Sequence, residues 1–135
     1  AAECSTEEVT LVVRVGTRLP LFHSAIGKAI LAVTPEERCE QIFGFARTEG
    51  VEVEREARAA YKLALEEYRA NGFCTGYGNW RSDVNGIAVP VFSLSDGRVY
   101  GLNVGGPSYR VKIKQLEVVY AEKLMKVAEA LSIQQ

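Results

Sequence analysis

The sequence contains few of the residues that build metal sites, disulfide frameworks and membrane spans. It has one histidine, His23, and three cysteines, Cys4, Cys39 and Cys74, none of them in a CxxC pair. This set lacks the ligand spacing of a zinc site, and an odd number of scattered cysteines is typical of free thiols in a reducing compartment. The longest nearly apolar run, residues 25–33, is interrupted by Lys28. It is far shorter than the about 20 residues that cross a bilayer.

An excess of charge of one sign is also missing. Sixteen Lys and Arg face 17 Asp and Glu, for a net charge of −1. Nucleic-acid binding is driven by excess positive charge, so this balance argues against DNA binding by the chain alone. No basic segment followed by an apolar stretch opens the chain, so we expect no signal peptide, no membrane partner and a cytoplasmic location. The absence of a Pro/Ser/Gly-rich linker predicts one domain over residues 1–135.

The hydrophobic pattern predicts an α+β fold with an antiparallel sheet. Three neighbouring strands late in the chain, with helices before and after them, favour this class. Thr34, with Pro35 at the first helical position, is predicted to cap one helix, and Asn71-Gly72 to end the longest one. Pro90 indicates an edge or a bulge in its strand. The predicted elements are strands at 10–15, 73–77, 87–92 and 98–104, and helices at 25–32 (capped by Ser24), 35–44, 54–70 and 111–131.

Catalytic groups are scarce. A nucleophile pair would have to use His23, and its sequence neighbour Ser24 would not normally point to the same reacting atom. Gly27-Lys28 resembles the end of a phosphate-binding loop but lacks that loop's first glycine and its final Ser or Thr. We therefore expect no catalytic residue, cofactor or metal. A small hydrolase or transferase that uses His23 or Asp83 as a base stays open as an alternative.

Three segments are better suited to binding. Small residues from Ser24 onward leave the first N–H groups of a helix accessible to an anion, although they are equally expected where a helix packs closely. Residues 76–86 mix glycines with Trp80 and amides, as ligand-binding loops and plain turns both do. Asn103 is predicted to be buried in an apolar strand, where it needs a partner.

These segments resemble the effector-binding domain of IclR-family bacterial transcriptional regulators. The resemblance extends from about Val12 to the C-terminal helix, and its motifs occur in the order found in the family. They are Val15-Gly-Thr-Arg-Leu-Pro-Leu21, Ser24-Ala-Ile-Gly-Lys-Ala-Ile-Leu-Ala32, Asn71-Gly-Phe73, Asn85-Gly-Ile-Ala-Val-Pro-Val-Phe92, Asp96-Gly97 and Asn103-Val-Gly-Gly-Pro-Ser108.

The resemblance implies a GAF/profilin-like antiparallel sheet with helices on its faces. It further implies a sensor that binds a small organic acid and assembles as a homodimer or homotetramer. DNA would be bound only by a winged helix-turn-helix domain, which we expect to be missing from this N-terminally truncated chain.

The resemblance also implies a set of pocket residues, to which we add Trp80 as nearby aromatic surface. They are Leu11, Leu19, Ser24, Ala25, Ile26, Gly76, Val84, Gly86, Asn103 and Gly105. The resemblance implies that family members carry acid, thiol or hydroxyl groups at the positions where this chain has Gly76, Gly86 and Gly105. We therefore expect an enlarged cavity for an aromatic or alicyclic carboxylate rather than a two- or three-carbon oxo acid. The alternatives are the small enzyme and a pure oligomerisation module without a ligand.

Overall fold

The computed structural model describes residues 21–79 and 81–134, and the predicted strand at 10–15 lies outside them. Three helices come first: α1 (Ala25–Ala32), α2 (Glu36–Glu49) and α3 (Val51–Asn71). Three strands follow, β1 (Cys74–Tyr77), β2 (Val84–Phe92) and β3 (Val99–Pro107). The chain then forms a short α4 (Ile113–Gln115), a π-helical turn η1 (Leu116–Tyr120) and α5 (Ala121–Gln134). This α+β order confirms the predicted class.

The described strands form an antiparallel sheet in the order β1-β2-β3. The β2–β3 turn is held by Asp96, whose carboxylate accepts from the Arg98 amide at 2.9 Å, and Gly97 adopts the left-handed conformation (φ 68°) that the predicted hairpin needs. Among the described strands, β1 ends its pairing opposite Ala88. Of these described strands, only β3 pairs with Pro90, through Gly101, as the predicted edge position of this proline implies.

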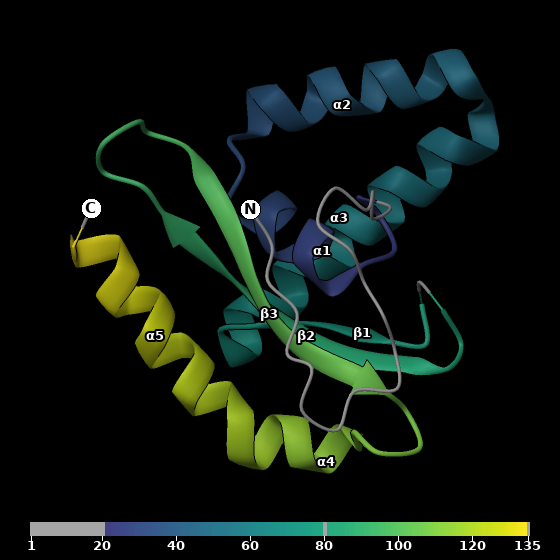
Figure 1. Cartoon of the computed structure of the whole chain (residues 1–135). Helices are drawn as coiled ribbons and strands as arrows, with labels where there is room; N and C mark the ends of the chain where they lie inside the picture. Colours follow the sequence, from purple (N-terminus) through teal and green to yellow (C-terminus); the bar gives the residue numbers. More distant parts are fainter. Residues whose placement is uncertain (1–20, 80, 135) are drawn as a thin grey trace.

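Helices cover the two faces of the sheet in different ways (Figure 1). On one face, large side chains of β2 pack against η1 and α5, with Leu116 fully buried. On the other face, α1 and α3 contribute alanines that pack against Cys74 and Ala88. A third cluster, centred on Leu31, Cys39 and Phe43, joins α1 and α3 to α2, which lies outside α3 (Figure 1).

Local signals placed several element ends correctly, but other elements are longer than predicted: α3 begins at Val51, β2 begins at Val84 and β3 ends at Pro107. The last helical segment runs over residues 113–134 instead of 111–131. Gly72 ends α3 in a left-handed conformation (φ 82°), as expected. However, α2 continues past Gly44 to Glu49, because Phe43 and Ala46 keep its apolar face against α3. The predicted cap by Thr34 is wrong: Pro35 is the N-cap of α2 and makes no side-chain capping bond, and the Thr34 hydroxyl instead donates to Ile30 O at 2.6 Å.

Candidate functional site

The start of α1 is fixed by a buried serine. Ser24 is 5% exposed and its backbone is extended (φ −101°, ψ 152°), as an N-cap requires. Its hydroxyl oxygen accepts from the Gly27 amide at 3.0 Å, which confirms the predicted cap. The described residues supply no acceptor for the amides of Ala25 and Ile26. Within residues 21–79 and 81–134, the first turn of α1 therefore has two N–H groups without an acceptor, and such groups favour an anion.

Three of the predicted site glycines form one row across the sheet. Gly76 pairs with Gly86, and Gly86 pairs in turn with Gly105. The neighbouring row on the same face is formed by Cys74, Ala88 and Asn103. Positions that are far apart in sequence therefore lie side by side on the face that α1 covers. We call Gly76, Gly86 and Gly105 the glycine row.

The glycine row allows backbone to approach backbone. A Cβ atom on Gly76 would lie 3.0 Å from Ala25 N, so β1 is in direct contact with the start of α1. A Cβ atom on Gly105 would lie 2.6 Å from Asn85 O in the neighbouring strand. The expectation that the missing side chains enlarge a cavity is therefore wrong at these two positions, where neighbouring backbone takes up the space. At Gly101, likewise, a Cβ atom would meet Ile26 Cγ1 at 2.9 Å.

The remaining predicted residues occupy less uniform surroundings. Val84 is half-buried on β2, two residues from Gly86 and hence on the same face. Asn103 is exposed, so its predicted burial is wrong; the partly buried amide is that of Asn85, which donates to Val111 O at 3.0 Å. Gly105 is exposed as well. Leu11, Leu19 and Trp80 lie outside the described residues.

Sequence reasoning missed a buried ion pair beneath α1. Lys28 is 3% exposed, and its Nζ lies 2.7 Å from Glu67 Oε1 on α3. The other oxygen of the same carboxylate accepts a hydrogen bond from the Thr75 hydroxyl on β1. Glu67 thus ties α1, α3 and the edge of the sheet together. The sequence does hint at this pair, because Lys28 is a single lysine in a nearly apolar run. Its partner could not be identified from the sequence, because Glu67 is 39 residues away.

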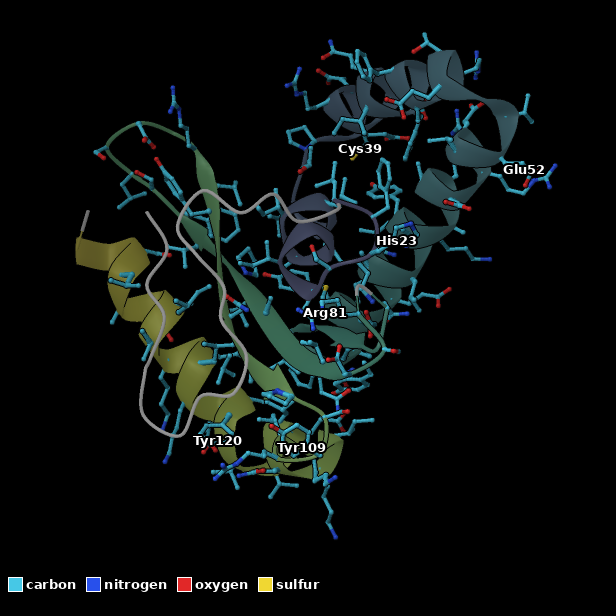
Figure 2. All side chains as sticks on the ribbon, turned by 45° about the vertical axis from the view of Figure 1, so that its right-hand side comes forward. His23, Cys39, Glu52, Arg81, Tyr109 and Tyr120 are labelled. Carbon is cyan, nitrogen blue, oxygen red and sulfur yellow. The ribbon has the colours of Figure 1, made fainter. Side chains whose placement is uncertain are left out.

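Groups that could support an enzyme are not brought together. His23 is half exposed on the loop before α1 (Figure 2). Its Nε2 lies 3.6 Å from Glu56 Oε2 on α3. The Ser24 hydroxyl is engaged as a cap, and the exposed Asp83 pairs with Arg81 at 3.1 Å. Residues 21–79 and 81–134 contain no cluster of three or more metal-ligating side chains. In that same part of the chain, no helix is long and apolar enough to span a membrane.

Two surface hollows lie away from the glycine row. One, of about 240 Å³, lies between the loop before α1 and α3, and its lining includes His23, Lys28 and Leu63. The other, of about 460 Å³, lies between the same loop and α2, and its lining includes Leu21, Phe22 and Phe45. Both are largely apolar, and among the described residues neither is lined by one that was predicted for the pocket.

Comparison with known proteins assigns the chain to a family. Residues 2–133 match the family described as "Bacterial transcriptional regulator IclR C-terminal". The chain belongs to this IclR family. It corresponds to the C-terminal effector-binding domain, and its relatives are named as transcriptional regulators rather than enzymes. This excludes the alternative of a small hydrolase or transferase.

Relatives and solved structures support the same assignment. The IclR-family chain is 30% identical over 127 residues to the HTH-type transcriptional regulator KdgR of Escherichia coli (strain K12), which covers 90% of this chain and 46% of KdgR. An IclR-family regulator from Brucella abortus superposes with a TM-score of 0.83 at 30% identity, covering 95% of this chain and 48% of that one. The chain thus spans about half the length of these relatives.

A more distant structure shows the fold alone. It is a double mutant of the PobR inducer-binding domain from Acinetobacter, in complex with 3-hydroxy benzoic acid. Its TM-score is 0.66 at 19% identity, and the match covers 96% of this chain and 76% of that one.

Proposed function

We propose that residues 1–135 act as one sensor domain that binds a small organic acid and thereby controls DNA binding by a winged helix-turn-helix in another part of the protein. The observation that carries this proposal is the contact between the start of α1 and the glycine row, where a Cβ atom on Gly76 would lie 3.0 Å from Ala25 N. Two N–H groups and a strip of backbone without side chains thereby meet at one place.

The anion would be held by backbone rather than by a cation. Lys28 is the basic residue of α1, but its charge is already neutralised by the Glu67 carboxylate, whose Oε1 lies 2.7 Å from Lys28 Nζ. The amides of Ala25 and Ile26 remain, and the positive end of the helix favours a carboxylate there. Ser24 orients these amides through its cap, and the exposed Asn103 can donate a further hydrogen bond from β3.

The rest of the ligand would lie over Gly86, where a Cβ atom would meet no atom nearer than Val104 O at 3.3 Å, and beside the exposed Gly105. Backbone without side chains offers a flat surface, which suits a planar or alicyclic ring better than a two- or three-carbon oxo acid. The PobR inducer-binding domain, which shares this fold, is in complex with an aromatic carboxylate. We therefore propose an aromatic or alicyclic carboxylate as the effector class.

A ligand at this place would couple α1 to the sheet. It touches α1 on one side and β2 and β3 on the other, so it favours the arrangement in which both are held together. A ligand shifts an equilibrium only by its difference in affinity for the two states. The change would reach DNA through a dimer or tetramer of the full protein.

A thermal-shift panel of benzoate, 3-hydroxybenzoate, cyclohexanecarboxylate and pyruvate tests the proposal. A ligand at 100 times its Kd stabilises by about 2.7 kcal/mol, which raises the Tm of a domain this size by several degrees. We expect at least one of the ring acids to raise the Tm by several degrees, and pyruvate to raise it less. No shift with any of these acids would contradict the effector class.

A pair of variants tests the helix-start amides directly. Ala25→Pro removes one N–H at the first helical position, where proline is tolerated, and the extended backbone of Ser24 is compatible with a following proline. Ala25→Gly is the matched control because it keeps the N–H. We expect only Ala25→Pro to abolish binding while both variants melt cooperatively. Equal affinity in both would remove these amides from the site.

A further inference from the structure

The outer face of α2 carries a stripe of residues that are exposed, apart from Ile42, which is partly buried. Arg38, Ile42, Phe45 and Glu49 recur at i, i+4, i+7 and i+11, so they lie on one side of the helix. Cys39 and Phe43 are buried on a different side, against α3. Phe45 is 70% exposed, although it is among the largest apolar side chains of the chain. We call the set Arg38, Gln41, Ile42, Phe45 and Glu49 the α2 stripe.

The charges at the ends of the α2 stripe oppose the preference of their own helix. Arg38 is in the first turn of α2, where the helix dipole favours acids, and Glu49 is its last residue, where the dipole favours bases. A second helix running antiparallel alongside would present its C-terminal end to Arg38 and its N-terminal end to Glu49. The two charges are therefore unfavourable for their own helix and favourable for such a neighbour.

The α2 stripe is also complementary to itself. When two copies of α2 lie antiparallel about a two-fold axis at the middle of the stripe, Arg38 faces Glu49 of the other copy, and this contact occurs twice. In the same register Ile42 faces Phe45. Such reciprocal pairing is what an isologous interface requires. We propose that a second copy of this chain docks on the α2 stripe.

The hollow beside α2 provides room for the central side chain of the other copy. Its volume is about 460 Å³, and Leu21, Phe22 and Ile42 line it. In the proposed register Phe45 of each copy is opposite Ile42 of the other, at the edge of this hollow. Each phenylalanine then inserts into an apolar recess instead of remaining 70% exposed to water.

Only a weak intrahelical hydrogen bond of Arg38 has to be exchanged for this contact to form. Arg38 donates to Gln41 at 2.9 Å in an exposed intrahelical bond, which costs little to exchange for the carboxylate of another copy. The stripe spans roughly 16 Å of helix, so it buries less than a standard interface of about 1,600 Å². The contact is therefore a weak one. It goes beyond effector binding, and neither proposal depends on the other.

Charge reversal tests the proposal in the 135-residue chain by sedimentation analysis over roughly 1 μM to 1 mM, the range in which small interfaces dissociate. Arg38→Glu and Glu49→Arg each place like charges opposite one another at both ends of the pair. We expect either variant alone to associate at least about tenfold more weakly than the unmodified chain. An equal mixture of the two variants restores opposite charges at both contacts, so it should associate as the unmodified chain does.

Two further variants provide controls. Lys62→Glu makes the same change of charge at an exposed position of α3 and should leave association unchanged. Phe45→Ala should weaken association, and no charge variant should rescue it. Circular dichroism checks that each variant keeps its helices. Three results would overturn the proposal: an unmodified chain that stays monomeric at 1 mM, reversed variants that associate normally, or a mixture no stronger than its components.

Discussion

The two faces of the sheet are built from side chains of different size. Toward α5, β2 presents Ile87, Val89 and Val91, which are nearly fully buried. Toward α1, the same strand presents Gly86 and Ala88. Large side chains keep α5 at the distance of an ordinary apolar core. Small ones let the start of α1 approach the strands until backbone meets backbone. The α5 face therefore forms an ordinary apolar core, and the α1 face holds the candidate site beside a buried ion pair.

The largest expected effect is at the buried ion pair of the α1 face. Lys28→Met leaves the Glu67 carboxylate buried without its cation, which should cost about 3–5 kcal/mol of unfolding free energy. Urea unfolding measures this loss, and Lys62→Met, at an exposed position of α3, is the matched control. A loss no larger than that of the control would show that the pair contributes nothing to holding α1 on the sheet.

Truncation on the α5 face should cost stability without affecting the site. Ile87 is fully buried, and Ile87→Ala should lower the unfolding free energy by about 3 kcal/mol through lost burial and the cavity left behind. The affinity for the acid found in the thermal-shift panel should stay unchanged, because Ile87 faces away from α1. A change in affinity as large as the change in stability would contradict the separation of the two faces.

Enlarging a side chain on the α1 face should weaken acid binding while lowering stability only modestly. Ala88 is fully buried among the alanines of α1 and α3, so Ala88→Leu should cost only about 1–3 kcal/mol by overpacking. It should nevertheless weaken acid binding, because the larger side chain displaces α1 from the glycine row. Ala70→Leu, at an exposed position of α3, controls for added apolar bulk. Undiminished affinity in Ala88→Leu would show that close approach of α1 is not needed.

The smallest effect is a pH dependence at Cys74. Burial is the main cause that raises the pKa of this thiol from near 9 to about 12, with the Glu67 carboxylate adding to it. Above pH 9 the unfolded chain loses this proton and the folded chain keeps it, so stability falls as pH rises. We expect about 1 kcal/mol of loss between pH 9 and 10. In Cys74→Ala that extra slope should vanish; a slope equal to that of the unmodified chain would contradict the assignment.

Local signals predicted more of the fold than of the site. The Ser24 cap, the glycine that ends α3 and the Asp96-Gly97 turn depend on neighbouring residues, so pattern alone located them. The run of α2 past Gly44 depends on α3, because packing of Phe43 and Ala46 outweighs the roughly 1 kcal/mol that a helical glycine costs.

The site depended on contacts that pattern does not encode. The glycines were expected to open a cavity, but strand register places Gly76 against Ala25 and Gly105 against Asn85. Lys28 and Glu67 meet only once α1 and α3 are folded onto β1. Asn103 was expected to be buried on the strength of its apolar neighbours, but burial is decided by what covers β3.

An amide-resolved NMR titration with 3-hydroxybenzoate and cyclohexanecarboxylate tests the central claim most directly. If the start of α1 and the glycine row form the effector site, at least one of these acids should shift the amide signals of Ala25, Ile26, Gly86 and Gly105 first. The signals of Val89 and Leu124, on the α5 face, should stay in place. Shifts confined to the hollow near Leu63, or to residues remote from α1, would contradict the claim.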